Sequence, residues 1–271
     1  MPTPSDAQLD AYVAFAHRLA DVGAEIALKH FRTHLDVENK QEHGFDPVTL
    51  ADKSIESAMR ALIEQSWPSH GVYGEEHGRF EGASGLTWVI DPIDGTRAFI
   101  TGSPLWGILI ALSDSTGPVL GMLEQPFLGE RFWGTRSQRK AAFYRRAGQT
   151  APLKARPCRE LKMAALSTTT MEMFDTPDTA RPMQALQKSV RLLRFGGDCY
   201  QYAQIALGFL DLVAETGLKP FDIHALIPII EGAGGAVTTW SGESAVHGGS
   251  ILAAGDPRVH AQALRELQKA R

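Results

Sequence analysis

Residues 91–96 place two carboxylates and a hydroxyl within six positions: Asp91-Pro92-Ile93-Asp94-Gly95-Thr96. Pro92 restricts the backbone between the two aspartates, and Gly95 permits a sharp turn. Carboxylate and hydroxyl oxygens are hard ligands, which suit Mg²⁺, Mn²⁺ or Ca²⁺ rather than zinc or copper. The stretch therefore indicates a metal site, although an Asp-Gly pair can also simply form a turn.

Three further acidic positions stand at the ends of expected elements. Asp52 comes three residues after Thr49, before an expected helix, where it could equally belong to a helix cap. Glu75 and Glu76 form a loop that could present a ligand, although paired glutamates are most often solvated surface. Asp222 precedes an apolar run, and an N-cap is again the alternative.

A shared site explains acidic residues at four turn positions better than a separate cap, turn or surface role for each of them. Two or more divalent ions about 3.5–4 Å apart, bridged by carboxylates, stabilise both the attacking water and the leaving oxygen of a phosphoryl group. Backbone N–H groups where Gly95 and Thr96 open a short helical turn could hold the phosphate. The pattern favours metal-assisted hydrolysis of a phosphate ester.

Two helices and a group of strands must position these residues in the first part of the chain. Apolar residues recur at three- or four-residue spacing from Leu9 to Ala27, and again over residues 53–65, ahead of Pro68. Short apolar runs at 87–90, 106–112, 119–124 and 131–134 are separated by turn residues. They predict an antiparallel sheet packed against the two helices.

The second part of the chain has a different order of predicted elements. Beyond residue 150, apolar runs alternate with helix-like stretches, which predicts a mixed-sheet α/β half. The boundary falls in the basic, Gly/Pro-punctuated stretch 145–157. We therefore expect two halves, 1–150 with most of the metal ligands and 151–271 with Asp222 and the residues that set substrate specificity.

Composition excludes several classes of protein. A net charge of −4 argues against a dedicated nucleic-acid binder. No apolar run approaches the roughly 20 residues that span a bilayer, and the N-terminus lacks the pattern of a secretory signal. Cys158 and Cys199 form no C-x-x-C pair, so a reducing compartment is expected although a disulfide between them stays open. We expect a cytoplasmic protein without nucleic-acid or membrane partners.

The motifs resemble those of the inositol monophosphatase family over about residues 46–235. The resemblance is carried by Gly74-Glu75-Glu76, by residues 91–96, and by Asp222 followed by Glu231-Gly232-Ala233-Gly234-Gly235. It implies a layered α-β-α-β-α sandwich and a phosphomonoesterase that is often dimeric. The implied cofactor is Mg²⁺, two or three ions per site, with Mn²⁺ as a substitute.

The resemblance also assigns roles. It makes Glu75, Asp91, the Ile93 carbonyl and Asp94 metal ligands, with Asp222 serving another ion and lying next to substrate. It implies that Thr96 and Asp52 together orient the attacking water and that Glu75 is also a catalytic residue. It further implies that the backbone amides of Gly95 and Thr96 bind the phosphate. Lys40 falls near a lysine that the family often has close to the site, at a slightly different spacing.

Within the family, the chain is most similar to histidinol-phosphate phosphatases. That similarity is carried by residues 69–74, 91–102, 197–200, 214–220 and 226–228. Histidinol carries an amine and an imidazole, so its pocket should be acidic, and Asp198 and Glu215 could supply the charge. A turn aspartate and a strand-end surface acid are the alternatives for these two residues.

Other functions stay open. A phosphatase for inositol 1-phosphate or another small sugar phosphate is the nearest alternative. A catalytically inert binding or regulatory protein on the same fold is the alternative of a different class. The basic segment 135–149 departs from the family pattern and could alter a loop or a subunit contact.

Overall fold

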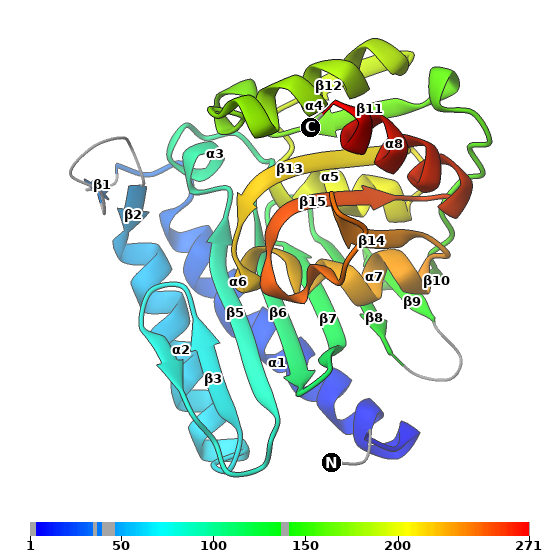
Figure 1. The fold of residues 1–271 in the computed structure, drawn as a ribbon. Coiled ribbons are helices and arrows are strands. Elements are labelled where there is room, and N and C mark those ends of the chain that lie inside the picture. The colour runs from blue at the N-terminus through cyan, green and yellow to red at the C-terminus, as the bar shows by residue number, and fades with distance from the viewer. Residues whose placement is uncertain (1–3, 35–36, 40–46, 137–140, 271) are drawn as a thin grey trace.

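Helices and sheets alternate through five layers of the molecule (Figure 1). The computed structural model describes residues 4–34, 37–39, 47–136 and 141–270. Helices α1 and α2 cover one face of an eight-stranded sheet, and α5, α6 and α7 lie between that sheet and a five-stranded sheet. Helices α4 and α8 cover the outer face of the second sheet. The expected α-β-α-β-α sandwich is confirmed.

The first layer consists of α1 (Asp6–His30) and α2 (Leu50–Ser66), as the apolar spacing predicts. Both helices begin at a capping box, in which the side chains of the N-cap and of the third helical residue bond each other's backbone N–H. In α2 these residues are Thr49 and Asp52, so the helix begins slightly earlier than its apolar spacing indicates. Asp52 therefore lies in the first turn of a buried helix end.

The eight-stranded sheet has the order β10-β9-β8-β7-β6-β5-β3-β4. Its strands are β3 (Gly71–Gly74), β4 (Gly78–Phe80), β5 (Thr87–Asp94), β6 (Gly107–Asp114), β7 (Gly117–Gln125), β8 (Glu130–Thr135), β9 (Ala142–Arg146) and β10 (Gln149–Pro152). The antiparallel pairing predicted for the runs between residues 87 and 134 is confirmed, and β3, which was not among the predicted strands, pairs parallel with β5. Parallel strands end at the same edge of a sheet, so the segment after β3 lies beside the end of β5.

The middle layer of helices packs closely against this sheet. It contains α5 (Asp198–Ala206), α6 (Pro220–Ile223) and α7 (Leu226–Gly232). A Cβ on Gly121 of β7 would lie 2.0 Å from the Ala225 carbonyl oxygen between α6 and α7. Because only glycine leaves room for this approach, the sheet fixes the position of the α6–α7 turn.

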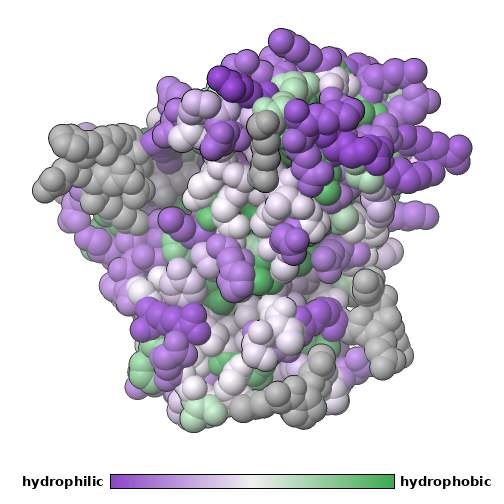
Figure 2. All heavy atoms as spheres, viewed as in Figure 1, coloured by the Kyte–Doolittle hydropathy of each residue, from purple (hydrophilic) through white to green (hydrophobic). Residues whose placement is uncertain are grey.

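The five-stranded sheet is mixed, as expected, with the order β12-β11-β13-β15-β14. Its strands are β11 (Ala165–Thr168), β12 (Leu192–Phe195), β13 (Leu212–Leu218), β14 (Ala236–Thr239) and β15 (Gly249–Ala254), and its outer helices are α4 (Pro177–Ser189) and α8 (Pro257–Lys269). Helix α8 buries Val259, Ala263 and Leu267 on one face. Figure 2 shows hydrophilic side chains gathered over this outer layer.

The remaining described elements are short. They are β1 (Val37–Asn39), β2 (Pro47–Thr49), α3 (Thr96–Ile100) and the 3-10 turns Leu161–Met163, Met171–Met173 and Ala245–His247. Cys158 and Cys199 are both buried free thiols. Among the described residues, no helix is both long and apolar enough to cross a membrane. The division at residue 150 stays a prediction; the first sheet ends at Pro152 and the second begins at Ala165.

Candidate metal centre and active site

A β-bulge at the end of β5 brings Asp91 and Asp94 to one side of the strand. Asp91 is paired with Leu109 of β6 and Asp94 with Gly107, so β5 has one residue more than its partner over this interval. In a regular strand, residues three apart face opposite sides of the sheet. The extra residue restores the parity and allows both carboxylates to serve one site.

Asp222 joins the two aspartates from the other half of the chain. One carboxylate oxygen from each of Asp91, Asp94 and Asp222 lies within 4.8 Å of the other two. The Asp222 Oδ2 atom accepts the Lys219 backbone N–H at 2.6 Å, which places Asp222 in the first turn of α6 rather than at its cap. Similarly, the Asp94 Oδ2 atom accepts the Cys199 N–H at 2.6 Å.

Burial and mutual repulsion oppose the ionisation of these carboxylates. Burial raises the pKa of Asp94 to about 8, with a further contribution from the charge of Asp222. Burial also raises the pKa of Asp222 to about 7, and the pKa of Asp91 rises well above its usual range. A divalent cation bound between the three carboxylates would favour their ionised forms, because it would compensate the negative charge.

Glu75 lies close to this group without being part of it. It directly follows β3, and its N–H donates to the Ile90 carbonyl at 3.3 Å. Its charge contributes to the raised pKa values of both Asp91 and Asp222, after burial as the largest cause. The parallel pairing of β3 with β5 produces this proximity.

Asp52 uses one carboxylate oxygen in the capping box of α2, and its other oxygen accepts no hydrogen bond from the described residues. Its Oδ2 atom accepts the Thr49 N–H at 2.8 Å and the Thr49 hydroxyl at 2.6 Å. Its Oδ1 atom is buried and has no hydrogen-bond partner among the described residues. Burial raises the pKa of Asp52, and a buried oxygen of this kind is expected to have a partner.

The turn after the bulge holds Thr96 against Ile93. The Thr96 hydroxyl donates to the Ile93 carbonyl at 3.0 Å, which leaves the hydroxyl oxygen able to accept hydrogen bonds. Gly95 has a φ of 86°, in the left-handed region that favours glycine, and caps the short helix α3. A Cβ at Gly95 would lie 3.0 Å from the Asp198 Cβ, so Asp198 approaches this turn closely.

Asp198 and Glu215 both lie beside the cluster, but they differ in their hydrogen bonds. Both Glu215 oxygens are in use, because they accept the Thr169 N–H, the Gln201 amide and the Tyr202 hydroxyl at 2.7–2.9 Å. Asp198 accepts no such bond from another described side chain. Burial raises its pKa to about 8, with contributions from the charges of Asp94 and Glu215, whereas the charge of Arg97 acts in the opposite direction.

Sequence reasoning missed the three partners of Glu215. Thr169, Gln201 and Tyr202 are uncharged residues outside the motifs that it used, on the segment after β11 and on α5. Gln201 and Tyr202 are buried polar residues within an apolar helix, and that pattern is the signal that could have identified them.

A cavity of about 170 Å³ connects these residues. It is lined by Asp94, Thr169, Met173, Asp198, Cys199, Tyr202, Glu215, Leu218, Asp222 and Leu226. Carboxylates from both halves of the chain reach it. Its lining is acidic, with apolar and uncharged polar side chains on the remaining walls, and therefore suits a small cationic molecule next to a metal site.

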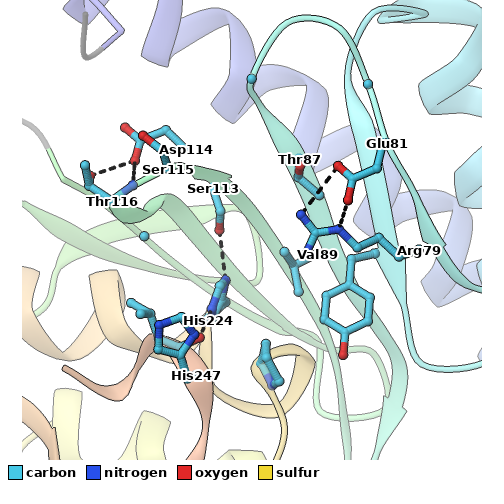
Figure 3. A pocket seen from close by; sticks show the side chains of 16 residues that line it. Arg79, Glu81, Thr87, Val89, Ser113, Asp114, Ser115, Thr116, His224 and His247 are labelled. Carbon is cyan, nitrogen blue, oxygen red and sulfur yellow. Dashed lines mark hydrogen bonds and ion pairs between the residues drawn. The ribbon is translucent and has the colours of Figure 1, made fainter. Parts of the chain in front are cut away.

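A larger cavity of about 420 Å³ lies elsewhere, over the same face of the first sheet (Figure 3). Here Ser113 bonds His224 Nδ1 at 2.9 Å, and Arg79 pairs with Glu81 on the opposite wall. His224 Nε2 lies 2.6 Å from the Val246 carbonyl, so the imidazole joins the two halves. Because this cavity holds none of the three clustered carboxylates, we take the smaller one as the candidate active site.

The cluster fits the metal that the sequence implies. All its donors are carboxylate oxygens, the ligand type that Mg²⁺ and Mn²⁺ prefer. The buried, unpartnered Asp52 oxygen gives independent support, since it requires a partner that the described residues do not provide. Lys40 and residues 137–140 of the basic segment lie outside the described residues, and a homodimer stays a prediction.

Comparisons with known proteins identify the family of this chain. Residues 8–271 match the inositol monophosphatase family. The bifunctional phosphatase IMPL2, chloroplastic, of Arabidopsis thaliana is 40% identical over 97% of this chain and 77% of its own. A histidinol-phosphatase of Chlorobaculum parvum is 33% identical over 88% and 89% of the two chains.

A solved structure supports the same assignment. An inositol monophosphatase from Zymomonas mobilis is 38% identical, and the two structures superpose with a TM-score of 0.84. The match covers 98% of this chain and all of the other. The chain therefore belongs to the inositol monophosphatase family.

Proposed function

We propose that the protein is a Mg²⁺-dependent phosphatase that hydrolyses L-histidinol phosphate to L-histidinol and phosphate. Family membership supports the coarser part, hydrolysis of a phosphate monoester. The observation that carries the finer part is Asp198, a half-buried carboxylate without a hydrogen-bonding side-chain partner among the described residues, beside the metal cluster. A substrate ammonium group would give it a charge-assisted partner.

The chain's own residues divide the chemistry between them. We assign the metal to Glu75, Asp91, the Ile93 carbonyl, Asp94 and Asp222. When bound, the divalent cation supplies Lewis-acid activation of water and of the phosphoryl oxygens. The backbone amides at the start of α3 bind the phosphate. Helix α3 directly follows the turn after Asp94 and holds that turn in place.

Asp52 and Thr96 orient the water that attacks phosphorus. The unpartnered Asp52 Oδ1 atom accepts a proton from that water, and its raised pKa suits a general base. The Thr96 hydroxyl donates to the Ile93 carbonyl, so its oxygen can accept the second hydrogen of the water. Neither cysteine takes part in this scheme.

Asp198 and Glu215 have different tasks in this proposal. Asp198 pairs with the substrate ammonium. Glu215 already accepts three hydrogen bonds, so it holds the cavity wall through Gln201 and Tyr202 and adds negative potential at longer range. The acidic lining thus recognises a cationic alcohol next to its phosphate.

Inositol 1-phosphate is the second candidate substrate. It is favoured by the 38% identity to the inositol monophosphatase of Zymomonas mobilis. Inositol is a neutral polyol, which would use carboxylates as hydrogen-bond acceptors but would not need their charge. The two substrates therefore predict different effects of removing one carboxylate.

The test measures phosphate release from histidinol phosphate, inositol 1-phosphate and adenosine bisphosphate, with and without Mg²⁺. We expect Mg²⁺-dependent turnover with the highest kcat/KM for histidinol phosphate. Turnover of inositol phosphate at an equal or greater rate would replace the proposed substrate. If none of the three esters shows metal-dependent turnover, the hypothesis of a catalytically inert binding protein would be favoured instead.

Asp198→Ala tests substrate recognition directly. We expect kcat/KM to fall about 10- to 100-fold more for histidinol phosphate than for a neutral sugar phosphate, since a charged hydrogen bond is worth about 1.5–3 kcal/mol. Asp175→Ala is the matched control, because Asp175 is an exposed loop residue. An equal decrease in kcat/KM for both substrates would show that Asp198 does not recognise the substrate ammonium group.

A further inference from the structure

The turn that carries Glu75 has an anchor of its own. Strands β3 and β4 pair antiparallel, with Gly74 opposite Gly78, and residues 75–77 form the turn between them. A turn of three residues at the edge of a sheet has little packing to hold it in place. Its position must be fixed by contacts beyond the two strands.

Glu56 of α2 makes these contacts. Its side chain is fully buried, one helical turn after Asp52. The Oε2 atom accepts the Glu76 backbone N–H at 2.7 Å, and the Oε1 atom accepts the His77 N–H at 3.1 Å. One carboxylate thus binds two successive N–H groups of the turn.

Arg60 completes the anchor. Its Nε atom donates to Glu56 Oε1 at 2.7 Å, and its guanidinium also donates to the Gly78 carbonyl at the start of β4. This ion pair compensates the buried charge. A Cβ at Gly74 would lie only 2.1 Å from Glu56 Oε1, so glycine at this position is required for the carboxylate to enter the turn.

We propose that Glu56 is a positioning residue for the metal site, which fixes the Glu75 turn to the helix that carries Asp52. Residues four apart lie on the same face of a helix, so α2 sets the distance between the acid that contacts the water and the arm that contacts the metal. Glu56 acts through Glu75 and touches neither metal nor substrate. This inference rests on the proposed function, since it takes Glu75 as a ligand.

Glu56→Gln is the main test. The amide keeps one acceptor oxygen but presents an NH₂ group to a backbone N–H and loses the ion pair with Arg60. We expect the Kd for Mn²⁺, titrated calorimetrically into the metal-free protein without substrate, to rise about 10- to 100-fold, the range typical of groups that orient metal ligands. The Mg²⁺ concentration for half-maximal activity should rise equally, while kcat at saturating Mg²⁺ changes much less.

Glu64→Gln is the matched control, because Glu64 is an exposed glutamate on the same helix. It should leave the Mn²⁺ Kd unchanged. If Glu56→Gln lowers the melting temperature but binds Mn²⁺ with the wild-type Kd, then Glu56 is only structural and the inference is overturned.

Gly74→Ala is a second variant that retains every charge. Its methyl group must displace the Glu56 carboxylate or the turn, so the same rise in the Mn²⁺ Kd is expected even if Glu56→Gln does not fold. An unchanged Kd in folded Gly74→Ala would contradict the inference. Failure of the wild-type protein to bind Mn²⁺ would contradict the proposed function instead, and the two failures are therefore distinguishable.

Discussion

Asp52, Asp94 and Asp222 each use one carboxylate oxygen to accept a backbone N–H. The second oxygen of Asp52 has no partner among the described residues, and Asp94 and Asp222 each contribute one oxygen to the shared cluster. A carboxylate has enough lone pairs to do both. Helix capping and metal binding are therefore compatible at one residue, which is why the two interpretations could not be separated from the sequence.

At the residue scale, Asp94→Asn should abolish activity and leave the fold intact. The amide oxygen can still accept the Cys199 N–H, and one repelling charge is removed from the cluster. We expect kcat/KM to fall at least about 100-fold, because a metal contributes several kcal/mol of charge stabilisation. Phosphate release with Mg²⁺ measures the loss, and thermal unfolding of the metal-free protein should show no decrease in melting temperature.

Asp175→Asn provides the control for this prediction, because it makes the same change at an exposed loop position. It should retain full activity. Wild-type rates in purified Asp94→Asn would refute the assignment of Asp94 as a metal ligand.

At the scale of elements, the sequence predicted the helices and most strands because their apolar spacing is regular. It could not predict the β5 bulge, since Asp91 and Asp94 are three residues apart and only the pairing with β6 reveals the extra residue. The parallel pairing of β3 was missed for a similar reason, because pairing partners are set by tertiary contacts. Both features decide which acids meet.

Gly121→Ala tests how the elements position Asp222. The added methyl would collide with the Ala225 carbonyl between α6 and α7. Overpacking of this kind typically costs about 1–3 kcal/mol, so the urea midpoint should fall. Because α6 carries Asp222, Mg²⁺ affinity should weaken in the same variant. An unchanged midpoint would show that the layers can move apart freely.

The N-terminus of α8 gives a prediction about pH. Hydrogen bonds from Arg258 lower the pKa of Asp256 to about 2, and Asp256 also accepts the Cys158 N–H at 2.9 Å. A carboxylate with a depressed folded-state pKa contributes stability above its unfolded pKa of about 3.8, and this contribution is lost as pH falls towards 2. Urea unfolding should show Asp256→Asn less stable than wild type at pH 7, by a margin that shrinks at pH 3. A constant margin would exclude this linkage.

At the scale of the molecule, the site depends on both halves of the chain. Asp91 and Asp94 come from the first sheet, whereas Asp222 comes from the middle layer. One continuous apolar core joins that sheet to α5, α6 and α7, and Ser113 bonds His224 across the same boundary. The two halves should therefore unfold together, and a metal that binds their shared carboxylates should stabilise both.

Metal removal tests this coupling. Trp240 is the only tryptophan beyond residue 150, so fluorescence reports mainly on the first half, whereas far-ultraviolet circular dichroism reports on both. With Mg²⁺ at about 100 times its Kd, stability should rise by about 2.7 kcal/mol and the melting temperature by roughly 5–10 °C, and EDTA should reverse the change. Both signals should show one coincident transition with and without metal. Asp94→Asn should lose the Mg²⁺ dependence while the two signals stay coincident. Separate transitions, of which only one responds to Mg²⁺, would mean that the carboxylates of the two halves do not form a common site.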